Sequence, residues 1–110
     1  MSLSTHVLDL SLGRPAAGVE LALTRRSDGD GWTPLDTART DDNGRVESLG
    51  PVTEPGTYRI RFQLAAYFAG REQSCFYPFA DVVFTIEDPG QRYHVPLLVS
   101  PYGYSTYRGS

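Results

Sequence analysis

The clearest strand pattern in this chain is Thr57-Tyr58-Arg59-Ile60-Arg61-Phe62-Gln63-Leu64. Large apolar or aromatic residues occupy every second position, and the residues between them are polar. Because successive side chains of a β-strand point to opposite faces of its sheet, this pattern predicts a strand with one face in a core and the other in solvent. A chain built from such strands forms a layered β structure.

Short strands are predicted on both sides of this stretch. The predicted strands are residues 5–10, 19–25, 32–40, 45–49, 57–64, 81–87 and 93–99, followed by a last strand after residue 103. Residues 65–70 favour a short helix that ends at a glycine, and residues 14–18 are predicted to form a turn. The sequence therefore predicts an all-β fold: an eight-stranded, two-sheet β-sandwich with one short helix.

Length and composition agree with that fold class. A chain of 110 residues is large enough to bury a core and too short for a second one, so we predict a single domain covering residues 1–110. The 11 glycines and 8 prolines are spread along the sequence, as expected for many short strands joined by turns.

Charge, hydropathy and cysteine content argue against several functional classes. The net charge is -3 and the sequence has no lysine, whereas a nucleic-acid surface needs concentrated Lys and Arg. No apolar run approaches the length of a membrane span or a signal-peptide core, so no membrane partner is expected. The single cysteine, Cys75, cannot form a disulfide within the chain, and we therefore expect a cytoplasmic protein.

The sequence closes on a tyrosine-rich segment, residues 100–110. Ser100-Pro101-Tyr102-Gly103 is predicted to be a turn, because proline presets one backbone angle and glycine accepts a positive φ. The resulting hairpin would deliver Tyr107, Arg108 and Ser110 to one fixed place, where their side chains could bind or react. The ordinary alternative is a polar edge strand that discourages aggregation.

His6 and His94 are the two histidines of the sequence. Every second residue from Val95 to Val99 must face the core, so His94 falls on the opposite face of its strand together with Pro96. The same alternation places His6 on the outer face of the first strand. Apolar residues beside both histidines imply that this face is covered, and we expect a cleft between subunits. The ordinary alternative for each is an isolated histidine on a sheet surface.

Several motifs together resemble the 5-hydroxyisourate hydrolases, a family related to transthyretin. They are Thr5-His6-Val7-Leu8-Asp9, Gly13-Arg14-Pro15-Ala16, Asp42-Asn43-Gly44-Arg45, His94-Val95-Pro96-Leu97-Leu98, Ser100-Pro101 and Tyr107-Arg108-Gly109-Ser110. The resemblance covers essentially the whole chain, and the closing Tyr-Arg-Gly-Ser distinguishes the hydrolases from the hormone carrier transthyretin. It implies an eight-stranded sandwich that hydrolyses 5-hydroxyisourate, from urate breakdown, to 2-oxo-4-hydroxy-4-carboxy-5-ureidoimidazoline.

The resemblance also implies the catalytic residues. These are His6, Arg45, His94, Tyr107, Arg108 and Ser110, of which His6, Arg45 and Tyr107 would bind substrate. A planar guanidinium can hold a planar ureide-type ring through paired hydrogen bonds and can stabilise an oxyanion. One histidine would take a proton from water while the other orients substrate or protonates the leaving nitrogen. The sequence does not distinguish which histidine is the base.

Other chemistries have weaker support in the sequence. The two histidines and Asp9 could bind zinc, but they lack a compact ligand motif. Ser110 has no nucleophile elbow around it. Cys75 has no basic neighbour closer than Arg71, which predicts a buried, inert thiol. We therefore expect no metal and no cofactor.

Two other functions remain open at the level of sequence. A transthyretin-like carrier would keep the fold and lose the need for His6, His94 and the closing segment. A structural sandwich module would stay monomeric, whereas the hydrolase is expected to be a homotetramer whose sites lie where subunits meet.

Overall fold

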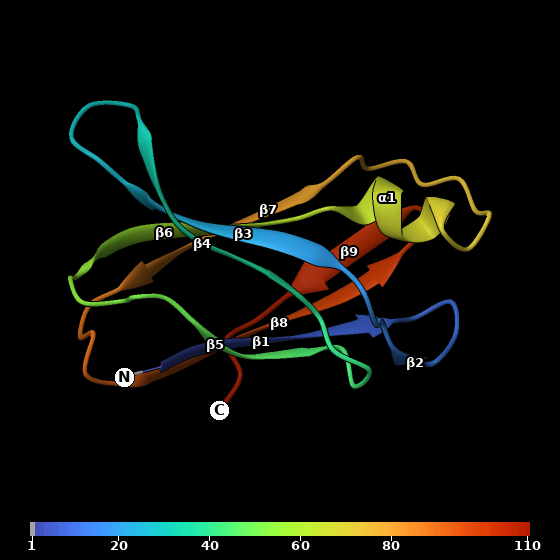
Figure 1. Ribbon diagram of the computed structural model, residues 1–110, viewed down its shortest axis with the longest axis horizontal. Coiled ribbons are helices and arrows are strands. Elements are labelled where there is room, and N and C mark those ends of the chain that lie inside the picture. Colours follow the sequence, from blue (N-terminus) through green and yellow to red (C-terminus); the bar gives the residue numbers. More distant parts are fainter. Residues whose placement is uncertain (1) are drawn as a thin grey trace.

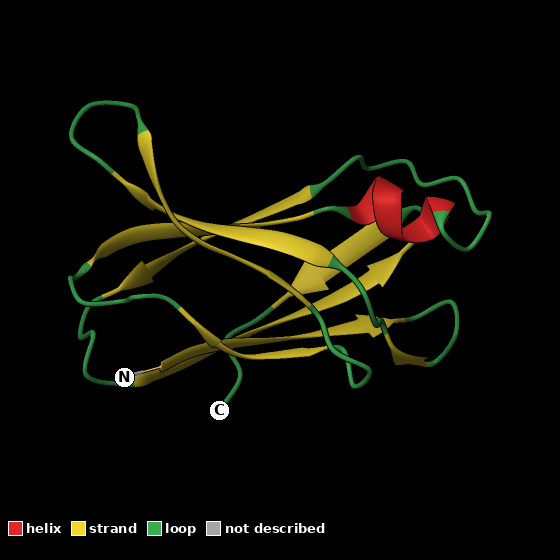
Figure 2. Cartoon of the chain, viewed as in Figure 1, coloured by secondary structure: helices red, strands yellow, loops and turns green. Residues whose placement is uncertain are grey.

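The computed structural model describes residues 2–110 as two facing β-sheets with one short helix (Figure 1, Figure 2). The elements are β1 (Ser2–Asp9), β2 (Arg14–Pro15), β3 (Glu20–Arg26), β4 (Trp32–Arg39), β5 (Arg45–Leu49), β6 (Gly56–Phe62), α1 (Leu64–Ala69), β7 (Ala80–Ile86), β8 (Arg92–Ser100) and β9 (Gly103–Thr106). The all-β two-sheet prediction is therefore confirmed.

Strand β1 is the central strand of the sheet that matters for function. The five-stranded sheet has the order β2-β1-β8-β9, and β5 pairs with β1 beside β2. The pairing of β1 with β8 is parallel, whereas β1 pairs with β2 and β5 antiparallel. The second sheet has the order β4-β3-β6-β7 and is antiparallel throughout.

The described residues form nine strands, and the predicted count of eight is wrong by one. The additional strand is β2, at residues that were predicted as a turn. The chain turns at Gly13, whose φ is +69°, and folds back along the end of β1, so that Leu8 pairs with Pro15. A backbone hydrogen bond of 2.9 Å from Ala16 N–H to the carbonyl of Val7 continues this contact. Glycine permits the reversal because it lacks a Cβ atom.

The core lies between the two sheets and follows the predicted alternation. The strand with which the sequence analysis began buries Tyr58, Ile60 and Phe62, and β8 buries Leu97 and Val99. Leu64, predicted as the last core residue of its strand, is instead the first residue of α1 and is still fully buried. Burial of apolar surface on this scale is the main stabilising contribution to the fold.

Helix α1 covers one end of the sandwich (Figure 1). It spans Leu64–Ala69, one residue earlier than predicted, and buries Leu64 and Phe68. It ends at Gly70, as the sequence indicated. None of the helices described within residues 2–110 is long and apolar enough to cross a membrane.

A buried carboxylate joins this helix to β1. Asp9 is fully buried, and its carboxylate accepts hydrogen bonds from Ser11 N–H at 2.8 Å, Tyr67 Oη at 2.7 Å and Arg71 Nη1 at 2.7 Å. Burial raises the pKa of Asp9, but these hydrogen bonds and the charge of Arg71 outweigh it and leave the pKa below its ordinary value. Burial and the bond to Asp9 raise the pKa of Tyr67 to about 12. Asp9 is therefore an ionised structural group.

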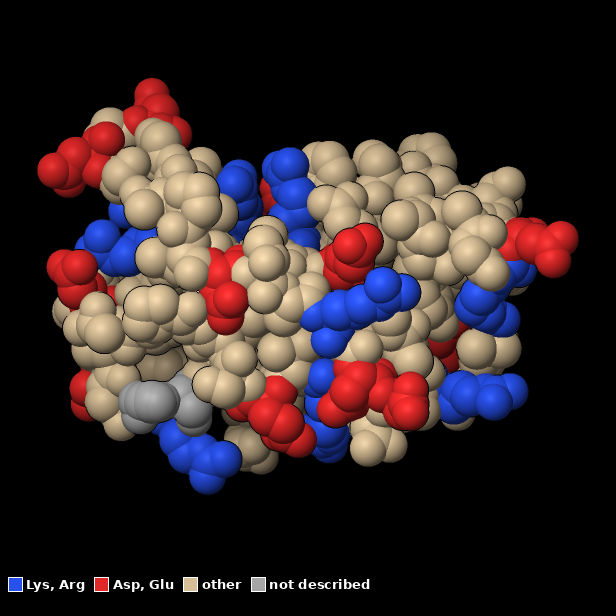
Figure 3. Space-filling view, viewed as in Figure 1, with Lys and Arg blue, Asp and Glu red and all other residues tan. Residues whose placement is uncertain are grey.

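Charged side chains are mixed on the surface. On the face shown in Figure 3, acidic and basic groups alternate without a continuous basic patch. Oppositely charged groups are also paired, as in the two hydrogen bonds of 2.7 and 2.8 Å from Arg61 to Asp81.

Candidate active site

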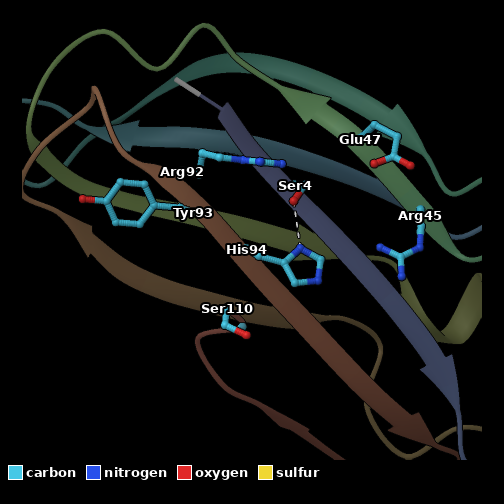
Figure 4. Close-up of a pocket in the computed structure, with 8 residues that line it drawn as sticks. Ser4, Arg45, Glu47, Arg92, Tyr93, His94 and Ser110 are labelled. Carbon is cyan, nitrogen blue, oxygen red and sulfur yellow. Dashed lines mark hydrogen bonds between the residues drawn. The ribbon is translucent and has the colours of Figure 1, made fainter.

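A polar pocket of about 390 Å³ lies on the outer face of the five-stranded sheet. It is lined by Ser4, Arg45, Glu47, Arg92, Tyr93, His94, Gly109 and Ser110. These residues come from β1, β5, β8 and the end of the chain, so segments far apart in sequence meet here (Figure 4). Apart from the glycine, every lining side chain carries a polar group.

Strand register explains why these residues meet. In β1, His6 lies opposite Arg45 of β5, and Ser4 lies opposite His94 of β8. Because Ser4 and His6 are two residues apart, they share the outer face, and both histidines therefore lie on it, as predicted. His6 stands beside the pocket rather than among the residues that line it.

A register shift between β1 and β5 shapes the wall that carries Glu47. Leu3 pairs with Leu49 whereas Thr5 pairs with Val46, so β5 has one residue more than β1 between these pairs. Such a bulge redirects side chains and is frequent beside active sites. Here it lies next to Ser4, where Glu47 reaches the pocket.

His94 is held by β1. Its Nδ1 atom lies 2.8 Å from Oγ of Ser4. Burial is the largest influence on the ring and lowers the pKa of His94, and the positive charge of Arg45, together with that of His6 when its ring is protonated, lowers it further. Glu47 and a backbone hydrogen bond with Ser4 act in the opposite direction without reversing the shift. The imidazole of His94 is therefore neutral at pH 7, the state that can accept a proton.

His6 is held differently. Its Nε2 atom lies 2.9 Å from the carbonyl oxygen of Asn43. A carbonyl oxygen can only accept, so Nε2 of His6 must carry the hydrogen. Nδ1 is therefore the nitrogen of His6 that remains available.

The Asn-Gly turn places both Asn43 and Arg45. The carboxylate of Asp41 accepts hydrogen bonds from Arg45 N–H at 3.0 Å and Asn43 N–H at 2.8 Å, and these bonds lower the pKa of Asp41. Gly44 has φ of +74°, and a Cβ atom there would lie 2.4 Å from the carbonyl oxygen of Val7. Only glycine allows the turn to pack this closely on β1 and deliver Arg45 beside His6.

The end of the chain lies against His94. Gly109 N–H donates a 2.8 Å hydrogen bond to the carbonyl of His94, and a Cβ atom on Gly109 would lie 2.5 Å from Cδ2 of the ring. Figure 4 shows the His94 ring between Ser4 above and Ser110 below in that view. The closing segment therefore confines the ring on the side away from Ser4.

Tyr107 and Arg108 do not join this pocket within one chain. The guanidinium of Arg108 lies 4.6 Å from the ring centre of Tyr93, a cation–π contact, and Tyr107 is 58% exposed. Both line a separate hollow of about 220 Å³ beside β7 and β8. Among the six predicted catalytic residues, the structure brings Arg45, His94 and Ser110 to the pocket, with His6 adjacent.

Residues considered for other chemistries lie elsewhere. Asp9 faces the interior, away from His6, and is occupied by Tyr67 and Arg71. Cys75 is half-buried rather than buried, and its Sγ atom lies 3.2 Å from the carbonyl of Tyr77 in the loop before β7. Within residues 2–110, no three His, Cys, Asp or Glu side chains gather as a metal site would require.

Comparison with a family model gives a match to the HIUase/Transthyretin family over residues 3–109. The chain belongs to the HIUase/transthyretin family. It is 47% identical over 110 residues to 5-hydroxyisourate hydrolase of Salmonella typhimurium, covering 98% of this chain and 80% of the relative. It is 45% identical over 111 residues to the hydrolase of Mus musculus, covering 98% and 94%.

The solved structures that superpose on this chain include a 5-hydroxyisourate hydrolase and a transthyretin. The structure of Klebsiella pneumoniae 5-hydroxyisourate hydrolase superposes with a TM-score of 0.87 at 35% identity and covers 100% of both chains. Sea bream transthyretin in complex with thyroxine superposes with a TM-score of 0.93 at 31% identity, covering 99% of this chain and 95% of the other. The backbone therefore does not separate the two, and the side chains of the pocket must do so.

Several pocket residues were not predicted from the sequence. These are Ser4, Glu47, Arg92, Tyr93 and Gly109. Three of them lie two positions from a predicted residue, a spacing that puts them on the same face of a strand. Ser4 precedes His6, Glu47 follows Arg45 and Arg92 precedes His94 in this way. Gly109 could have been found in another way, because it has no side chain and lies between Arg108 and Ser110, two residues that were predicted to be catalytic.

Proposed function

We propose that this chain hydrolyses 5-hydroxyisourate, opening its cyclic amide to 2-oxo-4-hydroxy-4-carboxy-5-ureidoimidazoline. The observation that carries the proposal is that His94 and Arg45 line one polar pocket, where burial and the charge of Arg45 lower the pKa of His94. This pair occurs in a chain whose curated relatives are 5-hydroxyisourate hydrolases. A base next to a fixed positive charge is what attack of water on a ring carbonyl requires.

The reaction adds one water molecule across a C–N bond. His94 accepts a proton from water as the oxygen bonds to the ring carbonyl carbon, and negative charge develops on the carbonyl oxygen. The guanidinium of Arg45 stabilises that charge and holds the ring by paired hydrogen bonds. The C–N bond then breaks, and the leaving nitrogen takes a proton.

His6 serves the second histidine role in this scheme. Its Nε2–H is used on the carbonyl of Asn43, so it meets the substrate through Nδ1. We assign to it either the orientation of the substrate, with Nδ1 as a hydrogen-bond acceptor, or protonation of the leaving nitrogen, for which Nδ1 must first take up a proton. Ser110 adds a hydroxyl at the pocket wall.

The roles proposed for Tyr107 and Arg108 require more than one chain. In a single chain they line the hollow beside β7 and β8, which shares Tyr93 with the pocket. We propose a homotetramer whose sites are completed where subunits meet, and we keep Tyr107 and Arg108 as groups that close them. Tyr107 and Val83, at 58% and 55% exposure, offer apolar surface on this side for such a contact. A cytoplasmic location stays a prediction from composition.

A transthyretin-like carrier is the alternative that the fold allows, given the TM-score of 0.93 to sea bream transthyretin. Sites for small aromatic ligands are mainly apolar with a few polar groups. The pocket here has two arginines, a glutamate and a histidine. Its composition favours catalysis on a polar heterocycle.

The direct test is to add the protein to freshly prepared 5-hydroxyisourate and follow its ultraviolet absorbance. The protein should remove the substrate faster than spontaneous decay, and Arg45→Gln should lose most of this acceleration. Decay at the spontaneous rate with folded protein would reject the hydrolase proposal. Saturable binding of thyroxine without turnover would favour the carrier.

A further inference from the structure

Ser4 makes the polar side-chain contact that fixes the His94 ring. The two residues are directly opposite in the parallel pairing of β1 and β8, and Ser4 Oγ lies 2.8 Å from Nδ1. A serine hydroxyl can either donate or accept, so the distance alone leaves two arrangements. They have opposite consequences for the other ring nitrogen.

A neutral imidazole carries one hydrogen. If Ser4 donates to Nδ1, the hydrogen of His94 is on Nε2, and Nε2 cannot accept a proton from water. If Ser4 accepts from Nδ1–H, the lone pair of Nε2 is free. The direction of one hydrogen bond therefore decides whether His94 can act as a base through Nε2.

The role proposed for His94 requires the second arrangement. A base that takes a proton from water through Nε2 needs the lone pair on that atom, so Nδ1 must carry the hydrogen of the neutral ring. Ser4 Oγ, 2.8 Å from Nδ1, is then the acceptor of that hydrogen.

The closing segment packs against the other edge of the ring. Gly109 lies so close that a Cβ atom would be 2.5 Å from Cδ2 and 3.2 Å from Cγ of His94. Ser4 Oγ lies at the Nδ1 edge, so Ser4 and Gly109 hold the ring from opposite sides.

We infer that Ser4 is a positioning residue whose Oγ accepts the Nδ1–H of His94, which leaves the Nε2 lone pair to take the proton from water. This inference rests on the proposed hydrolase function for its catalytic consequence. The tautomer itself belongs to the folded protein and does not depend on substrate. The two histidines then have opposite tautomers, because Nε2 of His6 carries the hydrogen.

The tautomer can be read by NMR of protein labelled with ¹⁵N-histidine, with His6→Gln used to assign the two rings. In the parent protein at neutral pH, His94 should show hydrogen on Nδ1 and none on Nε2. Ser4→Ala should shift the ring towards the Nε2–H form, and Ser4→Thr should keep the parent form. Hydrogen on Nε2 in the parent would overturn the inference, whatever the protein does to 5-hydroxyisourate.

Turnover tests the consequence. Ser4→Ala should lower kcat on the order of ten- to a hundredfold and change KM by about twofold or less, because the base is misdirected while Arg45 still binds substrate. Ser4→Thr should restore most of kcat. Ser48→Ala, which removes an exposed hydroxyl from neighbouring β5, should match the parent.

The outcomes separate the two proposals. Parent kcat in a folded Ser4→Ala variant would overturn the positioning role. If the parent protein does not hydrolyse 5-hydroxyisourate while His94 has the Nδ1–H tautomer, the proposed function fails and the inferred hydrogen bond stands. If Ser4→Ala does not fold, the parent spectrum and Ser4→Thr still decide.

Discussion

Strand β1 carries two polar clusters on opposite faces of one sheet, and they differ in what their polar groups bind. On the inner face, Asp9 is fully buried and saturated by Ser11, Tyr67 and Arg71. On the outer face, Ser4 holds one nitrogen of His94 and leaves the ring open to a pocket. The carboxylate of the inner cluster is hydrogen-bonded to other protein groups, whereas the outer cluster leaves polar groups available for a ligand.

The two faces of β1, a strand of eight residues, are expected to serve different ends: the inner face stability and the outer face catalysis. A buried carboxylate whose donors are all protein groups joins β1 to α1 and the following loop. A half-buried imidazole and a guanidinium that line a pocket are placed where a ligand could bind them. Changes on the inner face should therefore alter unfolding, and changes on the outer face should alter turnover.

The largest effect is expected for His94→Asn. Loss of the base should reduce turnover on the order of a thousandfold, since general base catalysis contributes about 10²- to 10⁴-fold. The melting temperature should change little because His94 lies outside the core. Turnover of 5-hydroxyisourate and thermal unfolding, measured on one preparation, check both parts. A variant that keeps parent turnover would place the base elsewhere.

Asp9→Ala should produce the reverse result. It removes the partner of Arg71 and Tyr67 in a fully buried site, which should cost about 3 kcal/mol of stability. Turnover per folded molecule should stay close to that of the parent at a temperature where the variant is folded. Urea unfolding gives the stability, and Asp28→Ala, in the exposed loop before β4, is the control. Loss of turnover in fully folded Asp9→Ala would show that the two faces are coupled.

Gly109→Ala tests how tightly the outer cluster is assembled. The added Cβ atom would meet Cδ2 of His94 at 2.5 Å, so the ring or the closing segment must move. A displacement of about 1 Å can cost on the order of a hundredfold in rate, and we expect a loss of about that size with little change in unfolding. Gly103→Ala is the matched control in the same hairpin, because its Cβ atom would lie an ordinary 3.7 Å from Ser100 Oγ. Equal turnover in the two variants would contradict the packing argument.

Part of the arrangement of β1 could be predicted from the sequence. Alternation placed His6 on the outer face of the first strand, because a period of two needs no knowledge of the partner strands. Asn43-Gly44, before Arg45, is likewise a local signal for a tight turn. The sheet partners, and with them the Ser4–His94 contact, depend on a parallel pairing across 90 residues that no local pattern contains.

Two further features depend on contacts that no local pattern contains. The turn predicted at residues 14–18 contains β2, because a two-residue strand is defined by its neighbour β1 and not by its own pattern. Tyr107 and Arg108 were expected in the pocket with Ser110, but in a single chain their side chains line a different hollow. Strand β9 ends at Thr106, so no strand pattern fixes which way Tyr107 and Arg108 point.

Acid should inactivate the protein before it unfolds it, because the two clusters titrate in different ranges. Burial and the charges of Arg45 and His6 hold the pKa of His94 below its usual value of about 6.5, so turnover should persist to slightly acidic pH and then fall as the ring gains a proton. Between the pKa values of the folded and unfolded chain, only the unfolded chain binds this proton, so a small part of the stability is lost there as pH falls. The contribution of the Asp9 carboxylate to stability is present above the ordinary carboxyl pKa of about 3.9 and is lost as pH falls through its lower pKa in the folded protein.

Turnover and circular dichroism on the same samples from about pH 8 to about pH 3 should therefore show two separate transitions, with activity lost first. A single transition, with turnover constant until the protein unfolds, would remove His94 from the role of base and leave the inner cluster as the only acid-sensitive part of β1.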